Sequence, residues 1–162
     1  MTYKTVYRNF FAWVILVLGV LLIFRQFSGV LFFPADSDDV GYLRGVIERS
    51  FGNYYQLFLL AGALALLPHF AWTMRMASNE AAMPAYDQFG TWGQSLFTSL
   101  GFLGTIVGVS LAVAGLEDAV VNQSPGTLIG GLSTAFDTTF LGLTGAIQLL
   151  IFRKISSLQV GR

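Results

Sequence analysis

Polar side chains that could bind or pass on an ion lie inside two strongly apolar segments in the last third of the chain. Thr105 lies in the first segment, and Asp137, Thr138 and Thr139 lie in the second. Hydroxyl and carboxyl oxygens can accept a proton or ligate a cation, but in hydrocarbon they are costly unless they face a cavity or a polar partner. These four residues are therefore expected to face a cavity or a polar partner, and they are the candidates for an ion pathway.

The composition indicates that membrane-spanning helices position these side chains. Of the 162 residues, 54% are hydrophobic and only 11% are charged, whereas a soluble domain carries about 25% charged residues. A helix needs roughly 20 apolar residues to cross a bilayer, and four segments qualify, approximately 10–33, 53–74, 91–116 and 127–152. Because backbone groups in lipid must be satisfied internally, we predict an all-α membrane protein in which residues 1–162 form one membrane domain.

The basic residues predict that both termini are cytoplasmic. Four crossings would place six of them on one side, which the positive-inside rule makes the cytoplasmic side: Lys4, Arg8, Arg75, Arg153, Lys154 and Arg162. Residues 34–52 would then form an external loop with a possible surface helix over 41–50, and residues 75–90 a short cytoplasmic link. The acidic residues of the loop lack the glycine and the glutamate of a calcium-binding loop, so no metal site is expected there.

Small residues recur at intervals of three or four in the last two spans. This spacing lets helix backbones approach closely inside a membrane. The third span contains Gly101, Gly104, Gly108 and Ala112, and the fourth contains Gly131, Ala135 and Gly142. Because glycine lowers helix stability, its concentration here predicts that these two helices pack on protein.

The predicted hydroxyls share one level. Thr105 lies eleven residues from Leu116 at the outer end of its span, and Thr139 lies twelve residues from Thr127. At 1.5 Å per residue both hydroxyls would lie about 17 Å deep. Residues two apart on a helix point about 200° apart, so we expect Thr139 to face a central pore and Asp137 to face a neighbouring helix or subunit. Asp137 could be a structural partner there or could transport protons, and both alternatives stay open.

The two segments resemble a known family. The stretch Gly101-Phe-Leu-Gly-Thr-Ile-Val-Gly108 resembles Gly-Leu-Leu-Gly-Thr-Val-x-Gly of ExbB and TolQ, and the stretch from Leu132 to Gly142 resembles the pore helix that follows it in the MotA/TolQ/ExbB proton channel family. The resemblance implies a homopentamer whose last two spans line a central pore around a dimer of single-span MotB/ExbD/TolR-like partners. It also implies that the threonines matching Thr105 and Thr139 line the ion path, and that the protein lies in a bacterial inner membrane.

The sequence departs from this family in three respects. Thr134 replaces the glutamate that ExbB and TolQ place five residues before the pore threonine, and Asp137 could be that acid in a new position. The pair Thr138-Thr139 resembles sodium-type stators, so the transported ion is either H⁺ or Na⁺. The link at 75–90 is too short for the large cytoplasmic domain of flagellar stators, which argues against a flagellar role.

We therefore expect an ion-conducting, stator-like subunit that uses no bound cofactor. The alternative is a structural scaffold subunit that conducts no ion. A solute transporter is disfavoured because the two halves show no inverted repeat. An enzyme is not expected, because no serine–histidine or paired-aspartate constellation occurs at one depth. A nucleic-acid partner is not expected either, because no basic stripe is present.

Overall fold

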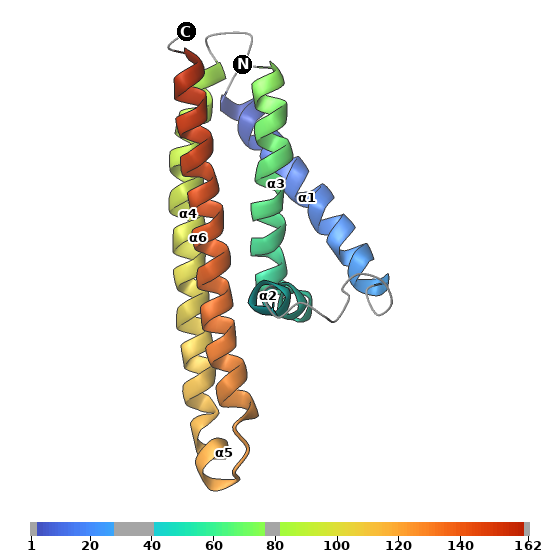
Figure 1. Ribbon diagram of the computed structural model, residues 1–162, viewed down its shortest axis with the longest axis vertical. Coiled ribbons are helices and arrows are strands. Elements are labelled where there is room, and N and C mark those ends of the chain that lie inside the picture. The colour runs from blue at the N-terminus through green and yellow to red at the C-terminus, as the bar shows by residue number, and fades with distance from the viewer. Residues whose placement is uncertain (1–2, 28–40, 77–81, 161–162) are drawn as a thin grey trace.

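The computed structural model describes residues 3–27, 41–76 and 82–160, and within these ranges every regular element is a helix. The six helices are α1 (Tyr3–Phe27), α2 (Gly41–Gly52), α3 (Tyr54–Met76), α4 (Ala82–Ala114), α5 (Leu116–Val121) and α6 (Gly126–Val160). The four long helices alternate in direction, so α1 begins and α6 ends at the same end of the bundle (Figure 1). We call this the basic end, because it carries Lys4, Arg8, Arg75, Arg153 and Lys154.

Four of the helices are long and apolar enough to cross a membrane, over Lys4–Phe24, Tyr54–Arg75, Tyr86–Val121 and Gly126–Ser157. The predicted all-α class with four spans is confirmed. The bounds differ most in α4, which begins at Ala82 rather than at 91. Pro84 is compatible with this early start, because a first-turn residue has no helical partner for its backbone N–H. Residues 28–33 of the predicted first span and 34–40 of the external loop lie outside the described ranges.

The α4–α6 hairpin is the longest unit of the fold, and these two helices share the most extensive interface. The surface helix predicted for 41–50 forms as α2 over Gly41–Gly52. Helix α2 lies across the N-terminal end of α3, whereas α4 and α6 continue past it to α5 (Figure 1). The turn that joins the hairpin therefore contains a short helix, α5, at the end of the bundle opposite the basic end.

The predicted hydroxyl layer of α4 and α6 lies beyond the start of α3. The Tyr55 hydroxyl, at the start of α3, donates to the Leu100 carbonyl of α4 at 2.5 Å. Thr105 lies five residues further toward α5, which corresponds to about 7 Å. The layer is thus level with α2, whose Arg49 contacts Asp137, and lies beyond the start of α3.

The buried core lies between α1, α3, α4 and α6 and extends from the basic end to Val46 of α2. It is rich in aromatic rings, and Phe10, Tyr86 and Phe89 all pack around His69. The Nε2 atom of His69 lies 3.1 Å from the Val6 carbonyl oxygen. This fully buried histidine is therefore held within the core and joins α3 to α1.

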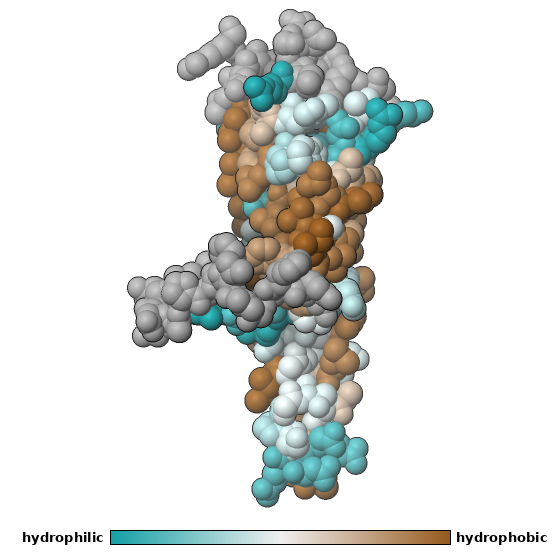
Figure 2. All heavy atoms as spheres, turned by 90° about the vertical axis from the view of Figure 1, so that its right-hand side faces the viewer, coloured by the Kyte–Doolittle hydropathy of each residue, from teal (hydrophilic) through white to brown (hydrophobic). Residues whose placement is uncertain are grey.

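The surface polarity agrees with a membrane position. On the face that carries α1, apolar side chains form a band, and hydrophilic side chains gather at the tip formed by α5 (Figure 2). Helix α1 is the most apolar of the candidate spans and the least buried within the chain. These features are typical of a helix that faces lipid.

Candidate functional site

The hairpin that carries the candidate site is packed through its small residues. A Cβ atom added to Gly108 would lie 2.4 Å from the Ala135 backbone nitrogen, and one added to Gly131 would lie 2.3 Å from the Ala112 backbone nitrogen. Nearer the basic end, a Cβ atom on Gly142 would lie 2.6 Å from the Gly101 Cα atom. Each approach is closer than a side chain permits, so the small residues set the separation of the two helices.

Replacing Gly108 with alanine is expected to destabilise the hairpin by about 1–3 kcal/mol, the usual cost of overpacking. The added methyl group would meet backbone atoms of α6, which cannot rotate away. Thermal or denaturant unfolding of the purified protein in detergent measures the effect.

The matched control is Gly130→Ala, because a Cβ atom at Gly130 meets nothing within 4 Å. It should be neutral or stabilise by up to about 1 kcal/mol through helix propensity. Equal effects of the two substitutions would show that the close approach of α4 and α6 does not matter for stability.

The hydroxyls of Thr105 and Thr139 meet at the edge of this interface. Their Oγ1 atoms are 2.5 Å apart, and both residues are half-buried. Thr105 Oγ1 also lies 3.1 Å from the Gly101 carbonyl oxygen, and Thr139 Oγ1 lies 2.9 Å from that of Ala135. The two threonines are thus at one level, as their distances from the hairpin turn predict.

This pair of hydroxyls has free acceptor capacity. Each hydroxyl has one proton and two lone pairs, so the pair has two protons for the three contacts just described. One hydroxyl donates to the other, and the second hydroxyl donates to its own backbone carbonyl. One of the four lone pairs then accepts a hydrogen bond, and three remain free to accept. Either oxygen can be the donor. The pair can therefore ligate a cation, or receive a proton from water and reverse its donor direction.

Thr138 occupies a different environment from Thr139. Its side chain is fully buried against α4, where a Cβ atom added to Gly104 would lie 2.5 Å from the Thr138 Cβ atom. Its hydroxyl donates to the Thr134 carbonyl at 2.8 Å and lies 3.1 Å from that of Ala135. Thr138 therefore belongs to the packed interface between α4 and α6. Its predicted role in the ion pathway stays a prediction.

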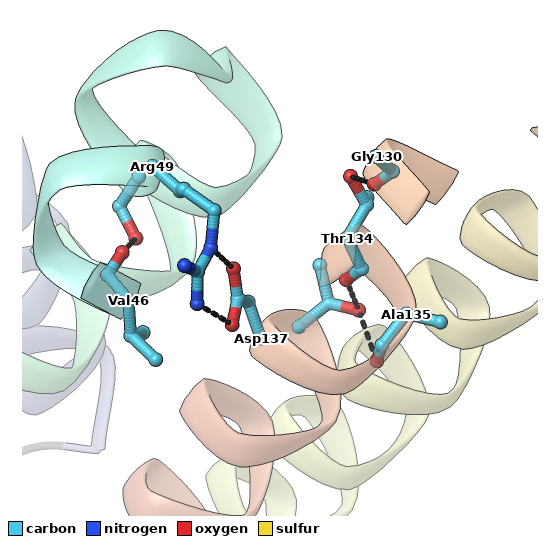
Figure 3. Close-up of polar contacts among 8 residues, drawn as sticks. Val46, Arg49, Gly130, Thr134, Ala135 and Asp137 are labelled. Carbon is cyan, nitrogen blue, oxygen red and sulfur yellow. Dashed lines mark hydrogen bonds and ion pairs between the residues drawn. The ribbon is translucent and has the colours of Figure 1, made fainter. Parts of the chain in front are cut away.

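Asp137 forms a two-point ion pair with Arg49 of α2. The Arg49 Nε and Nη2 atoms lie 2.6 and 2.9 Å from the two carboxylate oxygens of Asp137, and Figure 3 shows the guanidinium group reaching from α2 to α6. The Asp137 side chain is 1% exposed, and the Arg49 side chain is 44% exposed. Asp137 therefore faces a neighbouring helix, and both of its oxygens are engaged. This geometry favours the structural alternative for Asp137.

Sequence reasoning did not identify Arg49 as part of the site. It assigned this residue to a solvated external loop, 88 positions from its partner. The sequence feature that could have identified Arg49 is the amphipathic segment 41–50. Val46 and Ser50 of this segment are buried against the bundle. A buried face on that segment would have indicated that it lies close to a deeper helix.

These features define a multi-pass α-helical membrane protein with a polar layer on its longest hairpin. Residues 71–162, more than half of the chain, match the model of the MotA/TolQ/ExbB proton channel family, and the chain belongs to this family. The matched range includes α4 and α6, and therefore both threonines of the hydroxyl pair.

A second comparison found similarity to the Zorya protein ZorA of Escherichia coli. The two chains are 32% identical over 62 residues, which make up 38% of this chain and 11% of ZorA. The matched region thus covers about a tenth of the length of ZorA. No solved structure matches the chain significantly.

Proposed function

We propose that this protein is the ion-conducting, stator-like subunit of a motor in the bacterial inner membrane, and not an enzyme. In this proposal it couples the flow of H⁺ or Na⁺ to movement of a single-span MotB/ExbD/TolR-like partner. The observation that carries the proposal is the contact between Thr105 and Thr139 on a hairpin that the family model covers. The transported ion is the only non-protein component that the proposal requires.

The mechanism uses the partner's membrane acid as the site that is charged and discharged. An ion reaching the hydroxyl pair would exchange water for threonine oxygens and then neutralise that acid. The membrane potential supplies about 2.3 kcal/mol per charge per 100 mV. Two charge states of the acid would favour two positions of the partner, and this difference would drive the movement.

The proposed assembly is a homopentamer around a partner dimer. Its support is the apolar part of the hairpin that extends past α3. Ile106, Val113, Ile129 and Phe136 there are each more than half exposed in the protomer. So large an apolar surface needs cover from lipid or protein. Further copies and the partner's spans would cover it and would enclose the hydroxyl pair near a central axis.

The proposed orientation places the basic end in the cytoplasm and α5 outside. It rests on the concentration of Lys4, Arg8, Arg75, Arg153 and Lys154 at that end. Glu117 and Asp118 lie at the opposite tip, in the first turn of α5. Both termini would then be cytoplasmic, and the work of the motor would be delivered outside the membrane.

The second candidate function is a structural scaffold without ion conduction. It is favoured because two of the four predicted pathway residues make structural contacts with other helices. Thr138 is buried against α4, and Asp137 is paired with Arg49. Under this alternative, the hydroxyl pair would only join α4 to α6.

Reconstitution in lipid vesicles tests the proposal. Vesicles that contain the subunit and its single-span partner should take up H⁺ or Na⁺ when a potential is applied. Vesicles whose partner has asparagine in place of the membrane aspartate should not. Uptake in neither preparation would favour the scaffold. Equal uptake in both would show that the partner's acid is not part of the ion path.

A further inference from the structure

A groove between α1 and α3 lies outside the site described above. Its lining consists of Asn9, Ala12, Trp13 and Leu16 of α1 and Trp72 of α3, and its volume is about 280 Å³. It is open on one side and belongs to the α1–α3 pair, not to the α4–α6 hairpin. The groove is mostly apolar, with one amide at its wall.

The amide of Asn9 is half-buried and makes no hydrogen bond to any residue within 3–27, 41–76 or 82–160. An amide has two N–H donors and one oxygen acceptor, and leaving it unsatisfied in an apolar environment is costly. A ligand with ester or phosphate oxygens would satisfy the donors. An acyl chain alone would not.

Two cations lie about one helical turn from lining residues of the groove, toward the basic end. Arg8 lies four residues before Ala12 on α1, and Arg75 lies three residues after Trp72 on α3. Residues at these spacings share a helix face, and both arginines are exposed at the basic end. Tryptophan side chains are enriched where a membrane protein meets the lipid headgroups. The charge and the polarity therefore match a lipid whose headgroup is anionic.

We infer that this groove is a binding site for one anionic phospholipid of the leaflet at the basic end. The acyl chain would lie along Ala12 and Leu16, and the tryptophan rings would flank the glycerol. The phosphate would be held by Arg8 and Arg75 with the Asn9 amide. This inference concerns the lipid-facing helices and does not depend on ion conduction.

Native mass spectrometry of the full chain in detergent, titrated with phosphatidylglycerol or phosphatidylcholine, tests the inference. One phosphatidylglycerol should bind selectively. The double variant Arg8→Gln/Arg75→Gln should bind it about 25-fold more weakly, because each basic residue near an anionic surface contributes about a factor of five. The matched control Lys154→Gln removes an exposed charge at the same end but on α6, and it should bind as the wild type does.

A second variant tests the apolar part without changing charge. Ala12→Phe fills the groove from an exposed position, so it should fold normally and lose at least tenfold in lipid affinity. The inference would be overturned by equal affinity for the two lipids, by wild-type binding in both variants, or by a change in oligomer mass with Ala12→Phe. The last result would assign the groove to a neighbouring copy of the chain.

Discussion

Replacing Arg49 with glutamine should lower the free energy of unfolding by about 3 kcal/mol, the lower end of the range for breaking a buried ion pair. Asp137 would stay buried with its charge uncompensated, because it is 1% exposed. Asp137→Asn should cost less, because the Arg49 side chain it leaves behind is 44% exposed and can be hydrated. The double variant should recover part of the loss. Denaturant unfolding of the four proteins in detergent measures this cycle.

The exposed ion pair between Arg153 and Asp87 provides the matched control. It joins α4 to α6, at 2.8 Å, and its side chains are 30% and 63% exposed. Arg153→Gln should therefore change stability by about 1 kcal/mol or less. If Arg49→Gln had as small an effect as Arg153→Gln, the ion pair between α2 and α6 would not stabilise the fold.

The same variants separate the two roles considered for Asp137. A structural carboxylate can be replaced by asparagine with little change in ion flux, provided that the complex assembles. A carboxylate that titrates during transport cannot. Because both carboxylate oxygens are engaged by Arg49, we expect Asp137→Asn to retain flux. Loss of flux in a normally assembled Asp137→Asn complex would assign the residue to transport.

Replacing Thr139 with valine should reduce ion flux in reconstituted vesicles by about 10- to 100-fold. Valine has nearly the shape of threonine, so the change removes one hydroxyl and leaves Thr105 with only its backbone partner Gly101. A hydrogen bond to a charged group contributes about 1.5–3 kcal/mol, and each 1.4 kcal/mol is a factor of ten. The oligomeric mass should be unchanged, because the substitution adds no volume to the interface.

Two control variants separate loss of the hydroxyl from general damage to α6. Thr139→Ser keeps the oxygen and should keep most of the flux. Thr144→Val removes a hydroxyl that donates only to the Phe140 carbonyl of its own helix, at 2.8 Å, and should conduct normally. Undiminished flux in Thr139→Val would remove the hydroxyl pair from the ion path.

The sequence predicted those features of the site that follow from periodicity along one helix. The spacing of Gly101, Gly108 and Gly131 predicted a close hairpin, and distances from the turn predicted the common level of Thr105 and Thr139. Both follow from the fixed rise and rotation of a helix. The same rotation placed Asp137 on a different face from Thr139, as the structure has it.

What the sequence could not predict depends on how separate elements are placed. A hydropathy pattern shows where apolar residues occur but not where one helix ends beside another, so it could not show that Thr105 lies beyond the start of α3. No local pattern links Arg49 to a residue 88 positions away. Thr138 and Thr139 are adjacent and chemically identical, and their contacts with α4 decide that Thr138 is the buried one.

The central claim is that the hydroxyl pair borders a water-filled axis of the assembled subunit. The chain contains no cysteine, so Thr139→Cys in the membrane-embedded assembly can be tested with a small, charged thiol reagent against Ile15→Cys, on the exposed surface of α1. The account predicts rapid labelling at position 139 and slow labelling at position 15. Labelling at 139 as slow as at 15 would contradict it.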